Sequence, residues 1–356
     1  MDLILRAAGR LLGTELSDPV DLGGSRRSSV LRCRTTTGGT VIVKAYAAGP
    51  EALRCFSAEA AALSLGSAGP ALLGVDPAVP LVVMEDLGEA PSLADVLLGD
   101  DPKAAREGLL AWARALGRVA AESVPGRAEF ARLAAGFGGG GPTWADEPWL
   151  DRSAAALPPL LAGSGIAAPP GLADELARIG TADDDRYTAF TPGDTCPDNN
   201  LLTPDGLRLI DFEAATFQSV FLTAAYCRMP FATCWCVFRL PAGLAERIER
   251  TYRAEVVPVH PELAEDAVWQ AGLRRAVAGW TVHTTVRLLR RADEDQPMHR
   301  TRHPVPTVRQ LLRHRWETAS NLTEFPALAR TMELLLNGPA RDWRVAPLPE
   351  YPAFRG

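Results

Sequence analysis

One short segment, residues 191–213, constrains this chain more than any other part of its 356 residues. A polar turn that holds Asp194 and Asn199 leads into a short hydrophobic run. The turn Thr203-Pro204-Asp205-Gly206 then precedes a second hydrophobic run, which ends on Asp211. Turn-forming residues between two hydrophobic runs predict a β-hairpin. We therefore expect the three polar side chains to lie on one side of that hairpin.

Asp194, Asn199 and Asp211 all carry oxygen atoms that can bind a hard cation. Proteins hold Mg²⁺ with a few carboxylate or amide oxygens together with the phosphate oxygens of a nucleotide. A carboxylate that does not bind the metal can orient and deprotonate a hydroxyl group. The segment therefore predicts a site for chemistry on a phosphate-bearing ligand.

Residues 1–88 have the pattern of a small α+β lobe with an antiparallel sheet. The turn Thr37-Gly38-Gly39 separates two β-like runs and predicts a hairpin. Residues 51–65 place Leu53, Phe56, Ala60 and Leu63 on one face, which predicts the main helix of this lobe. The runs expected to form strands are 28–35, 40–46, 71–75 and 81–84.

Residues 89–356 predict a larger, mostly helical lobe. Helical periodicity dominates from Ser92 onward, and it is clearest over residues 103–122. The apolar stripe of that helix consists of Leu109, Trp112, Leu116 and Val119. Because the chain is long enough for two lobes, we place the division after residue 88.

The spacing of the polar residues resembles the kinase pattern. In that pattern an Asn follows the catalytic Asp by five positions, and the metal-binding triplet begins about a dozen residues later. The forms Gly193-Asp194-x-x-Pro197-x-Asn199 and Ile210-Asp211-Phe212-Glu213 resemble those of the aminoglycoside phosphotransferase family and its choline kinase and fructosamine kinase relatives. The resemblance implies a two-lobed protein-kinase-like fold. It also implies transfer of the γ-phosphoryl group of ATP, with Mg²⁺ as cofactor, to a hydroxyl group.

Carried over residue by residue, the resemblance implies that Asp194 is the catalytic base. It implies that Asn199 and Asp211 are Mg²⁺ ligands, and that Glu213 takes the acidic third place of the triplet. The alternative for Glu213 is a salt bridge without a catalytic role. Asp198 adjoins the motif and is expected to cap or support the loop rather than to bind metal.

Lys44 fits the same resemblance. Of the 37 basic residues only Lys44 and Lys103 are lysines, and Lys44 ends the hydrophobic run Val41–Val43. A retained lysine indicates a position that needs a compact ammonium group rather than a guanidinium. In these kinases such a strand lysine contacts the α and β phosphates, and Glu59 in the next helix would hold it by an ion pair. The alternative for Glu59 is a solvent-facing helix residue.

Two further segments complete the implied nucleotide site. Residues 82–87 resemble the segment that links the lobes, in which backbone groups of Glu85 and Leu87 would hydrogen-bond adenine. Gly23-Gly24-Ser25 occupies the place of the loop that covers the phosphates, with Ser25 nearest to them, although the full glycine pattern is missing.

Two positions depart from the family pattern. Pro192 stands where a histidine usually braces the catalytic loop, and Thr223 stands where a later Asp usually hydrogen-bonds the same loop. Looser support of about 1 Å can lower a rate about a hundredfold. Two alternatives therefore stay open. One is a slow kinase, and the other is a nucleotide-binding pseudokinase or partner subunit.

Composition excludes several classes of function. No apolar run reaches the roughly 18 residues that cross a membrane. The basic residues form no concentrated stripe, so we expect no nucleic-acid partner. The six cysteines are scattered, which predicts free thiols in the cytoplasm. No second pair or histidine stands at ligand spacing from Cys234-Trp235-Cys236, so we expect no metal there.

The identity of the acceptor is left open by the sequence. The net charge is -6, yet residues 220–356 hold 19 Arg against 14 Asp and Glu, which is unfavourable for a polycationic aminoglycoside. We expect a small hydroxyl-bearing molecule such as an antibiotic, a sugar or a nucleoside. The alternative is Ser or Thr of a precursor peptide. Residues 292–306 predict an exposed connection that could order when the acceptor binds.

Overall fold

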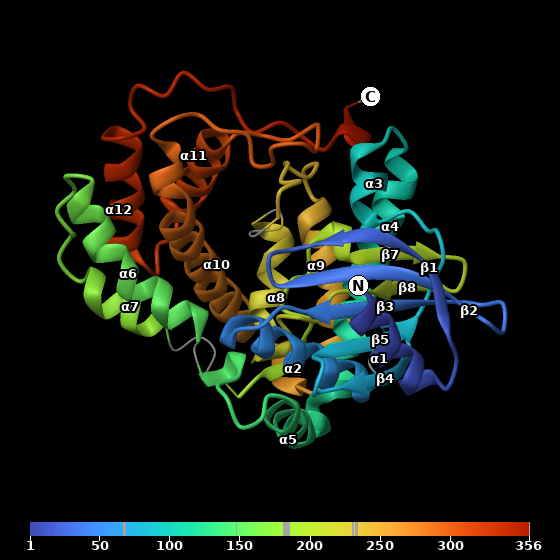
Figure 1. Cartoon of the computed structure of the whole chain (residues 1–356). Coiled ribbons are helices and arrows are strands. Elements are labelled where there is room, and N and C mark those ends of the chain that lie inside the picture. The colour runs from blue at the N-terminus through green and yellow to red at the C-terminus, as the bar shows by residue number, and fades with distance from the viewer. Residues whose placement is uncertain (67–68, 147, 181–185, 230, 232–233, 356) are drawn as a thin grey trace.

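The computed structural model describes residues 1–356 apart from 67–68, 147, 181–185, 230, 232–233 and 356. It consists of a small part built on a β-sheet and a larger part built mainly of helices (Figure 1). The chain passes from the first part to the second after the last strand of the sheet. The predicted α+β architecture, with an antiparallel sheet followed by a helical lobe, is confirmed.

The small part contains an antiparallel five-stranded sheet in the order β1-β2-β3-β5-β4. Its elements are α1 (Asp2–Leu12), β1 (Leu16–Gly24), β2 (Ser28–Thr35), β3 (Thr40–Tyr46), α2 (Pro50–Ser64), β4 (Leu72–Asp76) and β5 (Leu81–Glu85). Strand β3 lies in the centre, where Lys44 pairs with Val30 of β2 and with Val82 of β5. The hairpin of β2 and β3 has the bounds expected from the sequence.

Alternation along β3 decides which helix each side chain faces. Val41, Val43 and Ala45 join a small apolar cluster with α1. Tyr46 lies in the main core, to which α2 also contributes. Because Lys44 is two positions before Tyr46, it points to the same side of the sheet as α2. This register places an ammonium group beside the helix that carries Glu59.

Strand β1 was not expected from the sequence. Its residues include Asp18, Pro19 and two glycines, which are depleted in strands. They are tolerated because β1 is at the edge of the sheet, where proline interrupts no second ladder of hydrogen bonds. The pairing with β2 is irregular after Ser17, next to Asp18, whose φ is 48°.

The larger part is arranged around ten α-helices within the described ranges. These are α3 (Leu93–Leu98), α4 (Pro102–Ser123), α5 (Arg127–Phe137), α6 (Trp149–Gly163), α7 (Leu172–Gly180), α8 (Val220–Arg228), α9 (Leu244–Val256), α10 (Asp266–Leu288), α11 (Val308–Ala319) and α12 (Pro326–Asn337). None of them combines the length and the apolar character needed to cross a bilayer. The short 3-10 helices are η1 (Val124–Gly126), η2 (Trp144–Asp146), η4 (Pro197–Asn199), η5 (Pro261–Ala264), η6 (Leu289–Ala292) and η7 (Pro352–Phe354).

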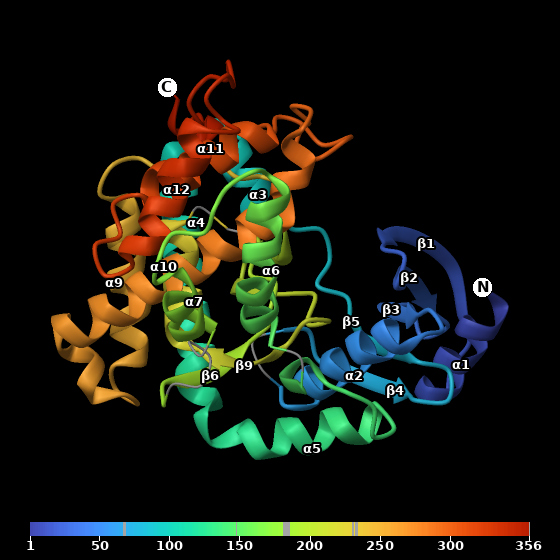
Figure 2. The same ribbon diagram turned by 90° about the vertical axis from the view of Figure 1, so that its left-hand side faces the viewer.

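Helix α10 runs through the middle of the helical part and packs against α6, α8 and α11 (Figure 2). It is buried on nearly every side, including Trp269 and Trp280. Trp280 stacks on Trp149 of α6 with ring centroids 4.4 Å apart. Trp269 and Trp280 thus form core, as is usual for such large side chains, whereas the half-buried Trp235 lines a cavity.

Two small two-stranded antiparallel sheets lie between the sheet of the first part and these helices. One pairs β6 (Thr188–Thr191) with β9 (Thr216–Ser219). The other is the hairpin of β7 (Asn200–Thr203) and β8 (Gly206–Leu209), which has the position predicted from Thr203-Pro204-Asp205-Gly206. Together the two sheets and their connections contain residues 191–213.

Gly272 of α10 provides a test of this packing. A side-chain carbon at Gly272 would overlap the ring of Phe221 in α8. We expect Gly272→Ala to lower the free energy of unfolding by about 1–3 kcal/mol, as overpacking of a core does. Gly163→Ala is the matched control, because nothing lies within 4 Å of that helical glycine. Urea unfolding of both variants checks this, and equal effects would contradict the packing described.

Candidate active site

The turn between β6 and η4 carries Asp194. Gly193 enters this turn with φ 85°, and a Cβ there would overlap the carbonyl oxygen of Ala214, so only glycine fits. The backbone N–H of Cys196 donates to Asp194 Oδ1 at 3.2 Å. Asn199 Nδ2 donates to the Asp194 carbonyl at 3.2 Å. Asp194 is thereby fixed at the start of the turn, with its carboxylate and the Asn199 side chain on the same cavity.

Other residues support the loop that carries Asp194, in place of the histidine and aspartate expected at Pro192 and Thr223. Trp112 Nε1 of α4 donates to the Thr195 carbonyl at 3.2 Å, and the buried Asn200 Nδ2 donates to the Cys196 carbonyl at 2.5 Å. Thr223 instead hydrogen-bonds the buried side chain of Tyr252. The two hydrogen bonds that support the loop were not predicted from the sequence. For Trp112 the reason is that 83 residues separate it from Thr195.

Lys44 joins the sheet to the catalytic hairpin. Its Nζ donates to Glu59 Oε2 at 2.6 Å and to Asp211 Oδ1 at 2.6 Å. Tyr46 Oη also donates to Glu59 Oε2, at 2.8 Å. Lys44 and Glu59 are 5% and 1% exposed, which rules out the solvent-facing alternative for Glu59. The structure therefore brings together three residues predicted from separate motifs.

Electrostatics keeps this lysine charged. Burial lowers the pKa of Lys44, but the nearby carboxylates of Glu59, Asp211 and Glu213 outweigh burial and raise it above the usual lysine value. A protonated ammonium at neutral pH is the form that can contact phosphate oxygens.

Asp211 has an unusual backbone conformation. Its φ of 66° lies in the left-handed region, which non-glycine residues rarely adopt and which is common at functional sites. The next residue, Phe212, is completely buried and packs closely on Gly69 and on the ring of Phe190. This anchored ring holds Asp211 with its side chain 37% exposed toward the cavity.

Glu213 lies in an ion-paired position. Its carboxylate is 2.6 Å from Arg27 Nη2 and 3.5 Å from Lys44 Nζ. Arg27 also pairs with Glu51 at 2.9 Å, so it links the turn after β1 to α2 and to the triplet. Sequence reasoning missed Arg27, although its place two residues after Ser25 in the phosphate-covering turn was a usable signal.

The remaining predicted nucleotide residues lie along the sheet. Ser25 is in the turn between β1 and β2, where its Oγ accepts the backbone N–H of Arg27 at 3.0 Å. The N–H of Glu85 donates to the Ala71 carbonyl at 2.9 Å. An adenine contact at Glu85 would therefore use its carbonyl oxygen, while Leu87 follows two residues later.

Three of the polar side chains predicted for the catalytic base and the metal site line one cavity of about 300 Å³. Asp194, Asn199 and Asp211 line it from the hairpin side. Burial raises the pKa of Asp194 above the ordinary value of 3.8, and hydrogen bonds from Cys196 oppose that rise. The oxygen-bearing side chains thus meet at one place, as Mg²⁺ coordination with a separate base requires.

Comparison with known proteins supports the same reading of the fold. Neither the protein-family models nor the curated proteins include a match. Among solved structures, the chain is similar to an ethanolamine kinase from Plasmodium vivax, with a TM-score of 0.50 and 11% identity over 93% of this chain and 86% of that one. The chain has the protein-kinase-like fold.

Further solved structures with this fold belong to other small-molecule kinases. A choline/ethanolamine kinase family protein from Mesorhizobium loti has a TM-score of 0.48 and 18% identity, covering 90% of this chain and 93% of its own. A choline kinase from Streptococcus pneumoniae has a TM-score of 0.48 and 15% identity, covering 92% and 98%. At the level of the fold, the ethanolamine kinase structure confirms the resemblance seen in the motifs.

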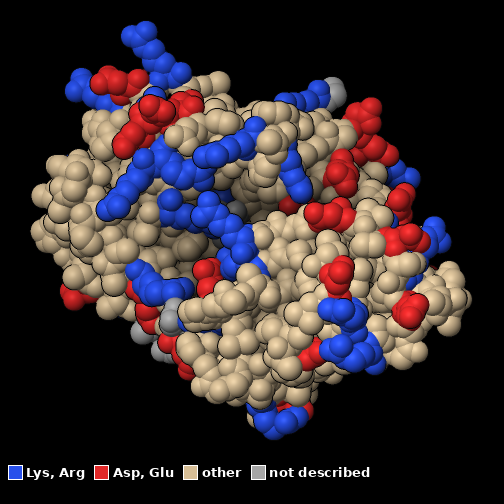
Figure 3. Space-filling view, in the orientation of Figure 1, with Lys and Arg blue, Asp and Glu red and all other residues tan. Residues whose placement is uncertain are grey.

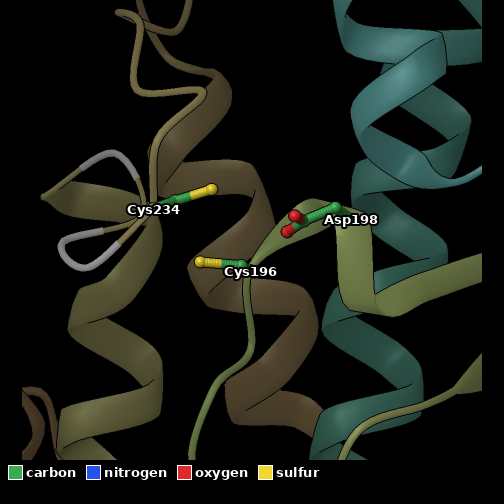
Figure 4. Close-up of side chains that lie close together, drawn as sticks. All are labelled: Cys196, Asp198 and Cys234. Atoms are coloured by element: carbon green, nitrogen blue, oxygen red, sulfur yellow. The ribbon is translucent and has the colours of Figure 1, made fainter. Parts of the chain in front are cut away.

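A thiol cluster adjoins the cavity of this kinase-like fold. The Sγ atoms of Cys196 and Cys234 and a carboxylate oxygen of Asp198 lie within 4.8 Å of one another. Figure 4 shows the three side chains gathered together. Cys234 Sγ is also 3.1 Å from Cys236 Sγ. Burial raises the pKa of the Cys196 and Cys234 thiols well above the usual value. The sequence spacing did not reveal this grouping, because Cys234 lies 38 positions after Cys196.

The cysteines that the structure describes are free thiols, as expected. They are Cys33, Cys55, Cys196, Cys234 and Cys236, and all five are buried. The side chain of Cys227 lies outside the described part. Buried thiols of this kind behave as small apolar side chains.

The ion pair of Lys44 predicts a large effect on stability. In Lys44→Met the carboxylate of Glu59 stays buried without its cation, and breaking a buried pair in this way costs about 3–5 kcal/mol of unfolding free energy. Lys103→Met, at the exposed start of α4, is the control and should change stability by less than about 0.5 kcal/mol. Adding Glu59→Gln to Lys44→Met should restore part of the loss. Urea unfolding at pH 7 measures all three, and equal values for both lysine variants would contradict the role given to Lys44.

Proposed function

We propose that this protein is an ATP-dependent phosphotransferase that moves the γ-phosphoryl group to a hydroxyl of a small molecule. The contact of Lys44 Nζ with Asp211 Oδ1, at 2.6 Å, carries the proposal. It joins the sheet of residues 1–88 to the hairpin that also bears Asp194 and Asn199. Each lobe thus supplies half of a phosphate site, with the division between them after residue 88.

Lys44 would contact the α and β phosphates, and Glu59 would hold its ammonium group in place. Asn199 and Asp211 would bind Mg²⁺, with Glu213 close enough to assist. Held by these residues, Mg²⁺ would supply positive charge that offsets the negative charge of the phosphates. The carbonyl of Glu85 and the backbone of Leu87 would bind adenine, and the turn at Ser25 would cover the phosphates.

Asp194 would accept the proton of the acceptor hydroxyl. As that proton leaves, the hydroxyl oxygen bonds to the γ-phosphorus, and the bond to the bridging oxygen breaks and releases ADP. Burial of Asp194 supports this role, because a raised pKa makes it a better base. The five buried free thiols fit the reducing cytoplasm expected from the sequence.

The base assignment predicts a loss of turnover without a loss of nucleotide binding. A positioned base contributes about 10²–10⁴-fold to a rate, so Asp194→Asn should lower kcat by at least about a hundredfold. The Kd for Mg-ATP should stay within about twofold, because Lys44 and Asp211 are intact. Asp205→Asn, in the exposed turn between β7 and β8, is the matched control. Mass-spectrometric screening of an acceptor panel measures transfer.

If wild type transfers no more phosphate than Asp194→Asn because neither phosphorylates any member of a broad panel, the pseudokinase alternative is favoured. Transfer to Ser or Thr of precursor peptides alone would favour the peptide alternative. Adding co-encoded peptides to the panel separates these outcomes in one experiment.

The acidic side of the pH profile should report Asp194. The active base is deprotonated, so kcat/KM should rise with pH as this group loses its proton. Because burial raises its pKa, the midpoint should lie above pH 3.8. Steady-state rates at fixed free Mg²⁺ check this, and the same limb in the residual activity of Asp194→Asn would rule out the assignment.

A further inference from the structure

The end of α10 forms one wall of the cavity, and this wall is basic. Arg287, in the last turn of α10, and Arg291, in η6, both line the cavity that holds Asp194. Figure 3 shows basic side chains gathered around a hollow on the face seen in Figure 1. This wall belongs to the helical part of the molecule, away from the sheet that carries Lys44.

In the described part of the chain, three aspartates line the cavity, and none of them is paired with Arg287 or Arg291. Asp194 accepts the backbone N–H of Cys196 at 3.2 Å. Asp211 pairs with Lys44 at 2.6 Å. Asp198 Oδ2 accepts Trp235 Nε1 at 2.7 Å and lies 3.5 Å from Arg302 Nη1. Within the described residues, neither Arg287 nor Arg291 forms an ion pair with a carboxylate. The charge of this wall is therefore not balanced by the protein.

Nearby groups respond to that positive charge. Burial, together with the positive charges of Arg287 and Arg152, lowers the pKa of His283 to about 4, so His283 is neutral at pH 7. Arg287 and Arg291 are four residues apart, a spacing at which like charges on a helical stretch repel and reduce stability. An anion between them would remove this repulsion.

We propose that the acceptor carries a phosphate or carboxylate group, which Arg287 and Arg291 bind while its hydroxyl faces Asp194. This inference rests on the proposed function and specifies its acceptor. Guanidinium groups suit such anions because their paired N–H donors match two oxygens. A cationic acceptor would be repelled by the same wall.

The size of the cavity favours a small anion over a folded partner. About 300 Å³ is near the lower end of small-molecule sites. Met298, from the exposed connection 292–306, lines the same cavity and limits it on the outer side. A compact hydroxy acid or phosphorylated alcohol fits these limits.

The main experiment compares acceptors that differ only in an anionic group. Full-length protein with Mg-ATP is tested on pairs such as glycerol with glycerate and nucleosides with their 5′-monophosphates. We expect kcat/KM to be at least about tenfold higher for the anionic member. Higher values for neutral or cationic members would overturn the proposal, and so would transfer only to acidic peptides.

Matched arginine variants test the residues. Arg287→Gln and Arg291→Gln should each raise KM for the anionic acceptor about tenfold or more, with little change in kcat or in the Kd for Mg-ATP. Arg290→Gln is the control, because Arg290 is adjacent but lines a different cavity. Equal changes in all three variants would overturn the assignment.

Inorganic phosphate separates this inference from the proposed function. Without nucleotide, phosphate should raise the thermal unfolding midpoint of wild type and of Arg290→Gln, and should do so less in Arg287→Gln and Arg291→Gln. If phosphate stabilises all four proteins alike, the anion site is wrong even when the protein is a kinase. If the anion effect holds while no acceptor is phosphorylated, only the proposed function fails.

Discussion

The contact between Lys44 and Asp211 is the constraint on which the site depends. One residue belongs to a central strand and the other to the end of a hairpin 167 positions later, and they meet at 2.6 Å. Holding a charged lysine in the core requires compensation, and Glu59 supplies it from α2 at 2.6 Å. The same ammonium group thus fixes the sheet, the helix and the catalytic hairpin relative to one another.

The apolar packing around this contact makes it possible. Phe212 is fully buried directly beside Asp211, and it fixes a backbone with φ 66° that would otherwise be unfavourable. Trp112 reaches from α4 to the carbonyl of Thr195 and takes over support of the catalytic loop. The loss of the usual histidine at Pro192 is therefore offset by a different donor from the core of the helical part.

Local parts of this arrangement could be predicted from the sequence. Asp194, Asn199 and Asp211 flank one hairpin, and the turn residues between its strands predict that hairpin directly. Lys44 and Glu59 lie on neighbouring elements, and the resemblance to the kinase pattern predicted their ion pair. Partners that are far apart in the chain have no such local pattern. Arg27 and Glu213, for example, are 186 positions apart. Strand β1 was missed because its sequence suits a turn, and only pairing with β2 makes it a strand.

Acidic and basic residues are unevenly distributed along the sequence, and they also line different sides of the cavity. Carboxylates of the first 219 residues, among them Asp194 and Asp211, line the side where a metal and a nucleotide would bind. Arg287 and Arg291, from the arginine-rich remainder, line the opposite side. A bound metal would offset the acidic side, while no described carboxylate pairs with the basic one, so the unbalanced charge would face the acceptor of the proposed reaction. Charge that is separated along the chain would then, in the folded protein, favour one class of substrate over another.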